Sequence, residues 1–101
     1  MKQKELDWRI WSKNDLVEER TYLRAQKKLP EMESAKQLRN IINKVSENDV
    51  IMDVGCASGH YLHSIRKINS KCKYIGVDAT KKYINSAKKI FSSDQNASFF
   101  N

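Results

Sequence analysis

Residues 50–59, VIMDVGCASG, decide the fold of this 101-residue chain. Four of the first five residues are apolar, and two glycines with other small residues follow. An amphipathic segment then runs from residue 60 to residue 68. This order predicts a strand, a tight turn and a helix. In an open α/β sheet such a turn lies at the carboxyl end of a strand, where ligands bind.

A second strand-like run, KYIGVD at residues 73–78, ends in the carboxylate of Asp78. An acid about 20 residues beyond a glycine turn is the spacing at which a βαβ nucleotide site binds ribose. The acid argues against a turn that serves no ligand. A dinucleotide fold fits less well, because its G-x-G-x-x-G pattern requires glycine where this chain has Ala57 and His60.

The two motifs together resemble those of the class I S-adenosylmethionine-dependent methyltransferases. DVGCASG at residues 53–59 is similar to the first motif of that family, an acid followed by glycines at alternate positions, with Ala57 in place of the middle glycine. YIGVD at residues 74–78 is similar to the second motif. The resemblance covers about residues 48–101, as expected of a βαβ unit and its extension. It implies S-adenosylmethionine as the cofactor.

The resemblance also implies roles for individual residues. Asp78 would accept hydrogen bonds from both ribose hydroxyls, since a carboxylate has two oxygens with several lone pairs. The main chain at Gly55 and Ala57 would run beside the amino-acid tail, whose ammonium would donate to Asp53. The expected cofactor-binding set is Asp53, Gly55, Cys56, Ala57, Gly59, Asp78 and Ala79.

Simpler roles stay open for several of these side chains. Asp78 could be a strand-end acid that caps the next turn, and Asp53 could face solvent or bridge the loop. The small size of Cys56 explains its position without a reactive thiol. No catalytic residue is assigned, because His60 follows the glycine loop and His63 is expected to face solvent.

The apolar spacing predicts two helices before this unit, over about residues 14–29 and from Glu31 to Val45, and two more between the strands. The expected fold class is α/β, the first half of a Rossmann-like three-layer methyltransferase fold, with parallel strands in the order 3-2-1. Residues 1–46 form a helical segment, and residues 47–101 form a partial S-adenosylmethionine-binding domain. The chain looks truncated at its third strand, which begins at Ala97.

The run from Val50 to Val54 lacks polar alternation apart from Asp53, which suits a strand covered on both faces. In the order 3-2-1 it is an edge strand. An apolar edge strand invites pairing with another chain, so we expect self-association through this strand.

Composition limits the partners and the compartment. The net charge is +7, but the excess comes from lysines spread along helices, which favours a solvated surface over a nucleic-acid partner. The sequence shows no signal peptide and no membrane span, so a cytoplasmic protein with reduced thiols is expected. The spacing of Cys56, His60, His63 and Cys72 does not suit a metal ion. The spacing of Trp8 and Trp11 predicts that both lie on one face of a helix, which would be either an amphipathic arm packed on the domain or a flap over the cofactor.

Two functional classes follow. The first is the cofactor-binding portion of a methyltransferase, whose acceptor is unknown and whose reaction depends mainly on positioning that acceptor. The second is a non-catalytic nucleotide-binding or interaction module that retains this half-site.

Overall fold

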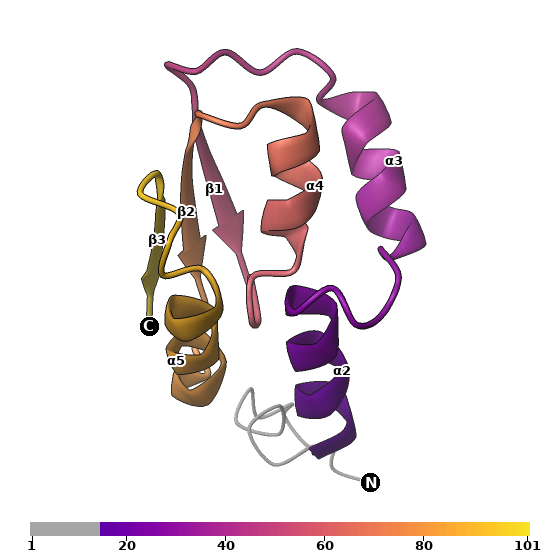
Figure 1. The fold of residues 1–101 in the computed structure, drawn as a ribbon, viewed down its shortest axis with the longest axis vertical. Coiled ribbons are helices and arrows are strands. Elements are labelled where there is room, and N and C mark those ends of the chain that lie inside the picture. Colours follow the sequence, from indigo (N-terminus) through magenta and orange to yellow (C-terminus); the bar gives the residue numbers. More distant parts are fainter. Residues whose placement is uncertain (1–14) are drawn as a thin grey trace, which may run out of the picture.

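The computed structural model describes residues 15–101, which form four helices and three strands (Figure 1). Trp8, Trp11 and the arm expected around them lie outside the described residues. In chain order the elements are α2 (Asp15–Ala25), α3 (Glu33–Ile41), β1 (Val50–Val54), α4 (Tyr61–Ile68), β2 (Lys73–Val77), α5 (Lys81–Ile90) and β3 (Ala97–Phe100).

Both N-terminal helices are shorter than expected. Helix α2 ends at Ala25 because Lys27 adopts a left-handed backbone with φ of 62°. The amide of Lys28 then donates to the carbonyl of Leu23 at 2.8 Å, as in a Schellman-type helix end. Helix α3 begins at Glu33 and ends at Ile41, so the apolar stripe expected to reach Val45 continues outside the helix.

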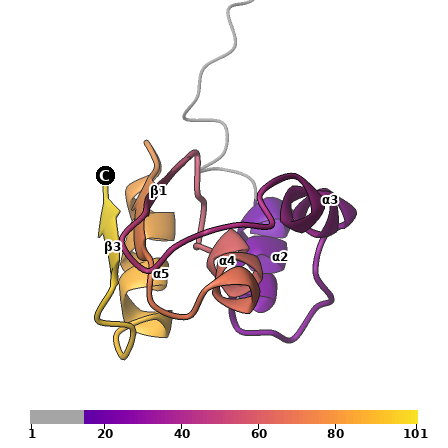
Figure 2. The ribbon, with the colours of Figure 1, turned by 90° about the horizontal axis from the view of Figure 1, so that it is seen from above.

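The three strands form one parallel sheet in the order β1-β2-β3, which confirms the expected order 3-2-1. Val50 lies opposite Lys73, and Val54 lies opposite Val77. Two right-handed crossovers in the same direction place α4 and α5 on one face of such a sheet. Figure 2 shows α2, α3 and α4 together on one side of the strands.

The core lies between the sheet and these helices. Its largest fully buried side chains include Tyr74, Leu62, Ile65 and Ile84. Gly76 of β2 is required here, since a Cβ at this position would come within 2.8 Å of the Phe99 ring and 2.9 Å of Cys56 Sγ. The core is therefore packed directly beneath the strand ends that carry the glycine loop.

The expectation that β1 is covered on both faces is wrong for the part of the chain that the structure describes. Val50, Met52 and Val54 are 56%, 61% and 77% exposed, whereas Ile51 between them is partly buried. The reason is that the four helices within residues 15–101 lie on one side of the sheet. Phe100 of β3 is also 55% exposed. We call Val50, Met52, Val54 and Phe100 the open sheet face.

We predict that the chain self-associates through β1 and the open sheet face, because covering apolar surface contributes about 25 cal/mol per Å². Met52→Lys places a charge in the middle of this surface and should shift the chain toward monomer. Light scattering coupled to gel filtration over a concentration series measures the effect.

Leu16→Lys on α2 is the matched control, since Leu16 is 59% exposed and Met52 is 61% exposed. An equal loss of association in both variants, or a wild-type chain that stays monomeric at every concentration, would contradict the prediction.

Candidate ligand-binding site

The glycine loop between β1 and α4 has three residues in the left-handed region. The φ angles are 75° at Gly55, 49° at Ala57 and 87° at Gly59. Hydrogen bonds fix the loop to the end of β2, since the amides of Gly55 and Cys56 donate to the Val77 carbonyl at 2.8 Å and 3.0 Å. The loop backbone therefore has a defined position at the carboxyl ends of two neighbouring strands.

Asp78 joins this loop to the start of α5. Its Oδ2 accepts from the Ala57 amide at 2.9 Å, and its Oδ1 accepts from the Thr80 amide at 2.8 Å. Thr80 is the N-cap residue of α5, but its side chain makes no capping hydrogen bond, although threonine is a favoured N-cap residue. Each carboxylate oxygen keeps a further lone pair, so Asp78 can serve the loop and a ligand at once.

A groove of about 650 Å³ opens at these strand ends. It brings together four of the residues expected from the sequence, namely Gly55, Ala57, Asp78 and Ala79. A Cβ built at Gly55 would meet no atom within 4 Å, so this side of the loop faces open space. The other lining residues are Val17, Val54, Val77, Thr80 and Asn101.

Two of these other lining residues, Val17 and Asn101, carried no local signal in the sequence. Val17 comes from α2, far from the motif, and its position depends on how that helix packs. Asn101 donates from Nδ2 to the Asp78 carbonyl at 3.0 Å, a contact that follows from the sheet register. Tertiary placement, rather than a motif, makes both residues part of the groove.

Cys56 and Gly59 do not line the groove. Cys56 is fully buried, and burial raises the pKa of its thiol to about 12, so it is a protonated core residue at neutral pH. At Gly59 a Cβ would come within 2.8 Å of the Phe99 ring and 2.9 Å of the Phe91 ring. Both residues pack the loop against the core of the sheet, on the side away from the groove.

Asp53 also lies apart from the groove. Its Oδ2 accepts a hydrogen bond from the Tyr74 hydroxyl at 2.6 Å, and Tyr74 is only 1% exposed. Burial raises the pKa of Asp53, while the Tyr74 hydrogen bond opposes that rise. Burial, followed by the Asp53 charge, raises the pKa of Tyr74 as well. The acid of the first motif is thus part of the helix-covered side of the sheet.

The two histidines follow the glycine loop in the chain, with His60 at the N-cap of α4 and His63 within that helix. Neither lines the groove. His63 is partly buried rather than solvent-facing, with Nε2 2.6 Å from the Ala25 carbonyl.

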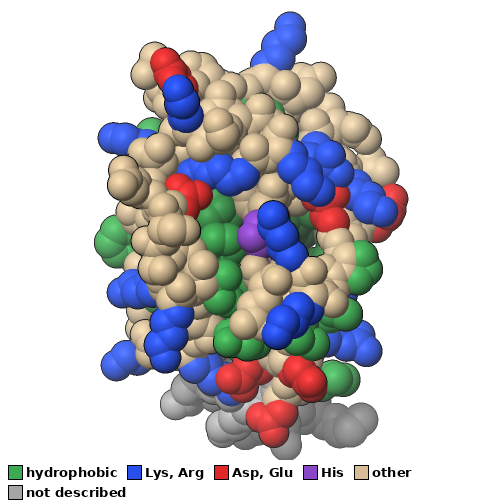
Figure 3. All heavy atoms as spheres, viewed as in Figure 1, with side chains coloured by type: hydrophobic (Ala, Val, Ile, Leu, Met, Phe, Trp, Pro, Cys, Tyr) green, Lys and Arg blue, Asp and Glu red, His purple; other side chains and the backbone are tan. Residues whose placement is uncertain are grey.

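Within residues 15–101 no three potential metal ligands gather into a metal site, and no helix is long and apolar enough to cross a membrane. On the face shown in Figure 3, lysine and arginine side chains are scattered over several elements.

The family comparison assigns the class of protein. A family model described as "Methyltransferase domain" matches residues 45–99, more than half of the chain. The chain therefore belongs to this methyltransferase-domain family, and its fold is that of the class I S-adenosylmethionine-dependent methyltransferases. No curated protein matches the chain significantly.

Solved structures support the fold. A SAM-dependent methyltransferase from Aquifex aeolicus shares 21% identity with a TM-score of 0.55, over 92% of this chain and 45% of its own. The plantazolicin methyltransferase BpumL, solved with a monoazolic desmethylPZN analog and SAH, shares 19% identity with a TM-score of 0.55, over 92% and 37%. YjhP from E. coli shares 16% identity with a TM-score of 0.55, over 80% and 36%.

The chain spans less than half the length of each of these three structures.

We predict that Ala57→Gly raises the free energy of unfolding by up to about 1 kcal/mol. A left-handed backbone costs a non-glycine residue about 1–2 kcal/mol, and the greater freedom of glycine in the unfolded chain offsets part of that gain. Gly55→Ala is the reciprocal variant and should lower it by up to about 1 kcal/mol, because a Cβ there meets no atom and the added backbone strain is partly offset by the lower freedom of alanine in the unfolded chain. Urea denaturation measures both, and changes of the same sign would contradict the loop geometry.

We also predict that Tyr74→Phe lowers the free energy of unfolding by about 1–3 kcal/mol at pH 7, because the half-buried Asp53 carboxylate loses its hydrogen bond. The folded-state pKa of Asp53 is raised and rises further in the variant, so the loss is present above that pKa and shrinks as the pH falls through it. Denaturation at several pH values tests this. A loss that does not change with pH would mean that packing, not the hydrogen bond, is affected.

Proposed function

We propose that this chain is the cofactor-binding portion of an S-adenosylmethionine-dependent methyltransferase. The observation that carries the proposal is the hydrogen bond from the Ala57 amide to Asp78, beside the open space at Gly55. It sets an acceptor carboxylate and an exposed stretch of main chain next to each other at the carboxyl ends of parallel strands, where α/β sheets bind nucleotides.

In this proposal Asp78 uses its remaining lone pairs to accept from the ribose hydroxyls. Ala79 follows Asp78 in the wall, and the cofactor's amino-acid tail lies along Gly55 and Ala57. A groove of about 650 Å³ is within the range of small-molecule sites. Asp53 is left out of the direct contacts, because it does not line the groove and accepts from Tyr74 on the helix-covered face of the strand.

The cofactor supplies a methyl group on a sulfonium, which is a good leaving group. The residues of this chain bind and orient it. Of the described residues that line the groove, Asp78 is the one with a titratable side chain, and it already accepts two backbone amides. A base for the methyl acceptor, where the acceptor needs one, therefore comes from outside this groove wall.

We predict that S-adenosylhomocysteine binds the chain and that Asp78→Ala weakens this binding by about tenfold or more, as expected for hydrogen bonds to a charged group. Isothermal titration calorimetry measures the dissociation constants. Asp49→Ala is the control, since this exposed aspartate lies in the turn before β1, at the other end of the strand.

An unchanged dissociation constant in Asp78→Ala would remove that residue from the site. Tighter binding of a nicotinamide dinucleotide than of S-adenosylhomocysteine would overturn the proposed cofactor.

A further inference from the structure

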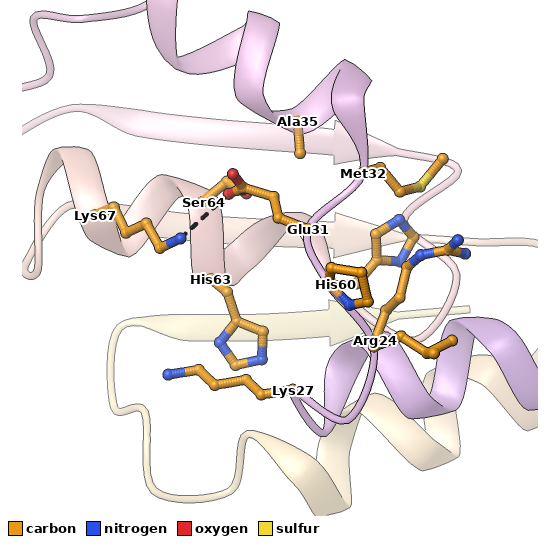
Figure 4. Close-up of a pocket in the computed structure, with 11 residues that line it drawn as sticks. Arg24, Lys27, Glu31, Met32, Ala35, His60, His63, Ser64 and Lys67 are labelled. Atoms are coloured by element: carbon orange, nitrogen blue, oxygen red, sulfur yellow. Dashed lines mark hydrogen bonds and ion pairs between the residues drawn. The ribbon is translucent and has the colours of Figure 1, made fainter.

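A second pocket lies between α4 and the connection from α2 to α3, apart from the groove (Figure 4). Its volume is about 250 Å³. We call it the basic pocket. Its polar and charged lining consists of Arg24, Lys27, Glu31, His60, His63, Ser64 and Lys67.

Cations outnumber acids in this wall. Arg24, Lys27 and Lys67 line it, against the single carboxylate of Glu31. That carboxylate is already engaged, because Oε1 accepts from Arg39 at 2.5 Å and Oε2 accepts from Ser64 at 2.5 Å. Lys67 lies 3.6 Å from the same Oε2. The positive charges of Arg24 and Lys27 are therefore not balanced by the pocket's own acid.

Two buried nitrogen atoms of this pocket lack partners among the described residues. They are Nε of Arg24 and Nδ1 of His60. Most buried polar atoms in folded proteins are hydrogen-bonded, so two such atoms in one pocket suggest a missing polar ligand. Burial, with the charge of Arg24 as the next cause, lowers the pKa of His60 to about 4. His60 is thus neutral at pH 7 and offers one N–H donor.

The turn that ends α2 places Arg24 and Lys27 at this pocket. Lys27 has φ of 62° although it is not glycine, and this turn ends α2 directly beside the pocket. His63 is already committed, with Nε2 2.6 Å from the Ala25 carbonyl. In Figure 4, Arg24 and His60 lie toward the carboxyl ends of the strands, while the amines of Lys27 and Lys67 lie toward the other end.

We infer that the basic pocket binds a compact oxyanion, a carboxylate or a phosphate group, through Arg24 and His60. The guanidinium of arginine matches the oxygens of both groups. The neutral imidazole of His60 adds one donor, and Lys27 and Lys67 attract the anion to the pocket. A volume of about 250 Å³ admits one such group with its immediate attachment rather than a whole nucleotide. The inference does not depend on the cofactor assigned to the groove.

Two ligands share this chemistry. One is the carboxylate at the amino-acid end of an adenosyl cofactor, because His60 directly follows Gly59 of the glycine loop. The other is a phosphate or carboxylate that enters independently of the groove. The experiment is arranged to separate them.

The first arm titrates the full chain with inorganic phosphate at constant ionic strength and follows the His60 imidazole resonances by NMR. We expect a saturable shift, and at least about tenfold weaker binding in Arg24→Gln. Arg20→Gln is the matched control, because Arg20 is an exposed arginine on the same helix and does not line the pocket. Lys27→Gln should give a smaller loss.

Thermal unfolding separates binding from a structural role. Phosphate should raise the melting temperature of the wild type and of Arg20→Gln, by linkage to the folded state, but not that of Arg24→Gln. A lower melting temperature of Arg24→Gln that rises with phosphate as much as the wild type does would make Arg24 structural and overturn the inference.

The second arm compares S-adenosylhomocysteine with methylthioadenosine, which lacks the amino-acid carboxylate. If the cofactor supplies the oxyanion, S-adenosylhomocysteine competes with phosphate, and Arg24→Gln weakens the binding of S-adenosylhomocysteine but not that of methylthioadenosine. If the oxyanion is independent, phosphate still binds when S-adenosylhomocysteine is present. Either result supports an oxyanion site. The inference is overturned if phosphate does not shift the His60 resonances and Arg24→Gln binds S-adenosylhomocysteine with unchanged affinity. A wild-type chain that does not bind methylthioadenosine would instead contradict the cofactor proposed for the groove, and not the basic pocket.

Discussion

The attachment of the glycine loop to the end of β2 is the constraint on which the rest of the site depends. The Val77 carbonyl accepts from two successive loop amides at 2.8 Å and 3.0 Å, and the next amide donates to Asp78 at 2.9 Å. These three bonds use backbone donors that no helix satisfies, because α4 begins only at Tyr61. They also require the left-handed angles at Gly55 and Ala57. The groove exists because the loop is turned in this way.

The three glycines of the chain meet different requirements. Gly55 is needed for its backbone angle and leaves space beside the groove. Gly59 and Gly76 are needed because aromatic rings and Cys56 occupy the space that a Cβ would take. Phe99 contacts both positions, so one side chain of β3 fixes how closely the loop approaches the sheet. Ala57 shows that the loop tolerates a methyl group, at the cost of some strain.

Much of this arrangement could be predicted from the sequence. The strand order follows from two right-handed crossovers, and the meeting of Asp78 with the glycine loop follows from the parallel register. Contacts between distant residues could not be predicted. The hydrogen bond from the Tyr74 hydroxyl to Asp53, 21 positions apart in the chain, is one such contact. The early end of α2 depends on the left-handed angle of a lysine, for which the sequence gives no signal.

The residues of the loop from Gly55 to His60 contact three different environments, namely the groove, the core and the basic pocket. Gly55 and Ala57 line the groove, Cys56, Ser58 and Gly59 are buried, and His60 lines the basic pocket. A ligand that held the first part of this segment more tightly would therefore also restrict His60, because the buried middle part transmits displacement through close packing. Any such coupling is reciprocal, so an oxyanion in the basic pocket would change ligand affinity in the groove by the same factor. The buried residues Cys56, Ser58 and Gly59 are the part of this segment through which such a coupling would act.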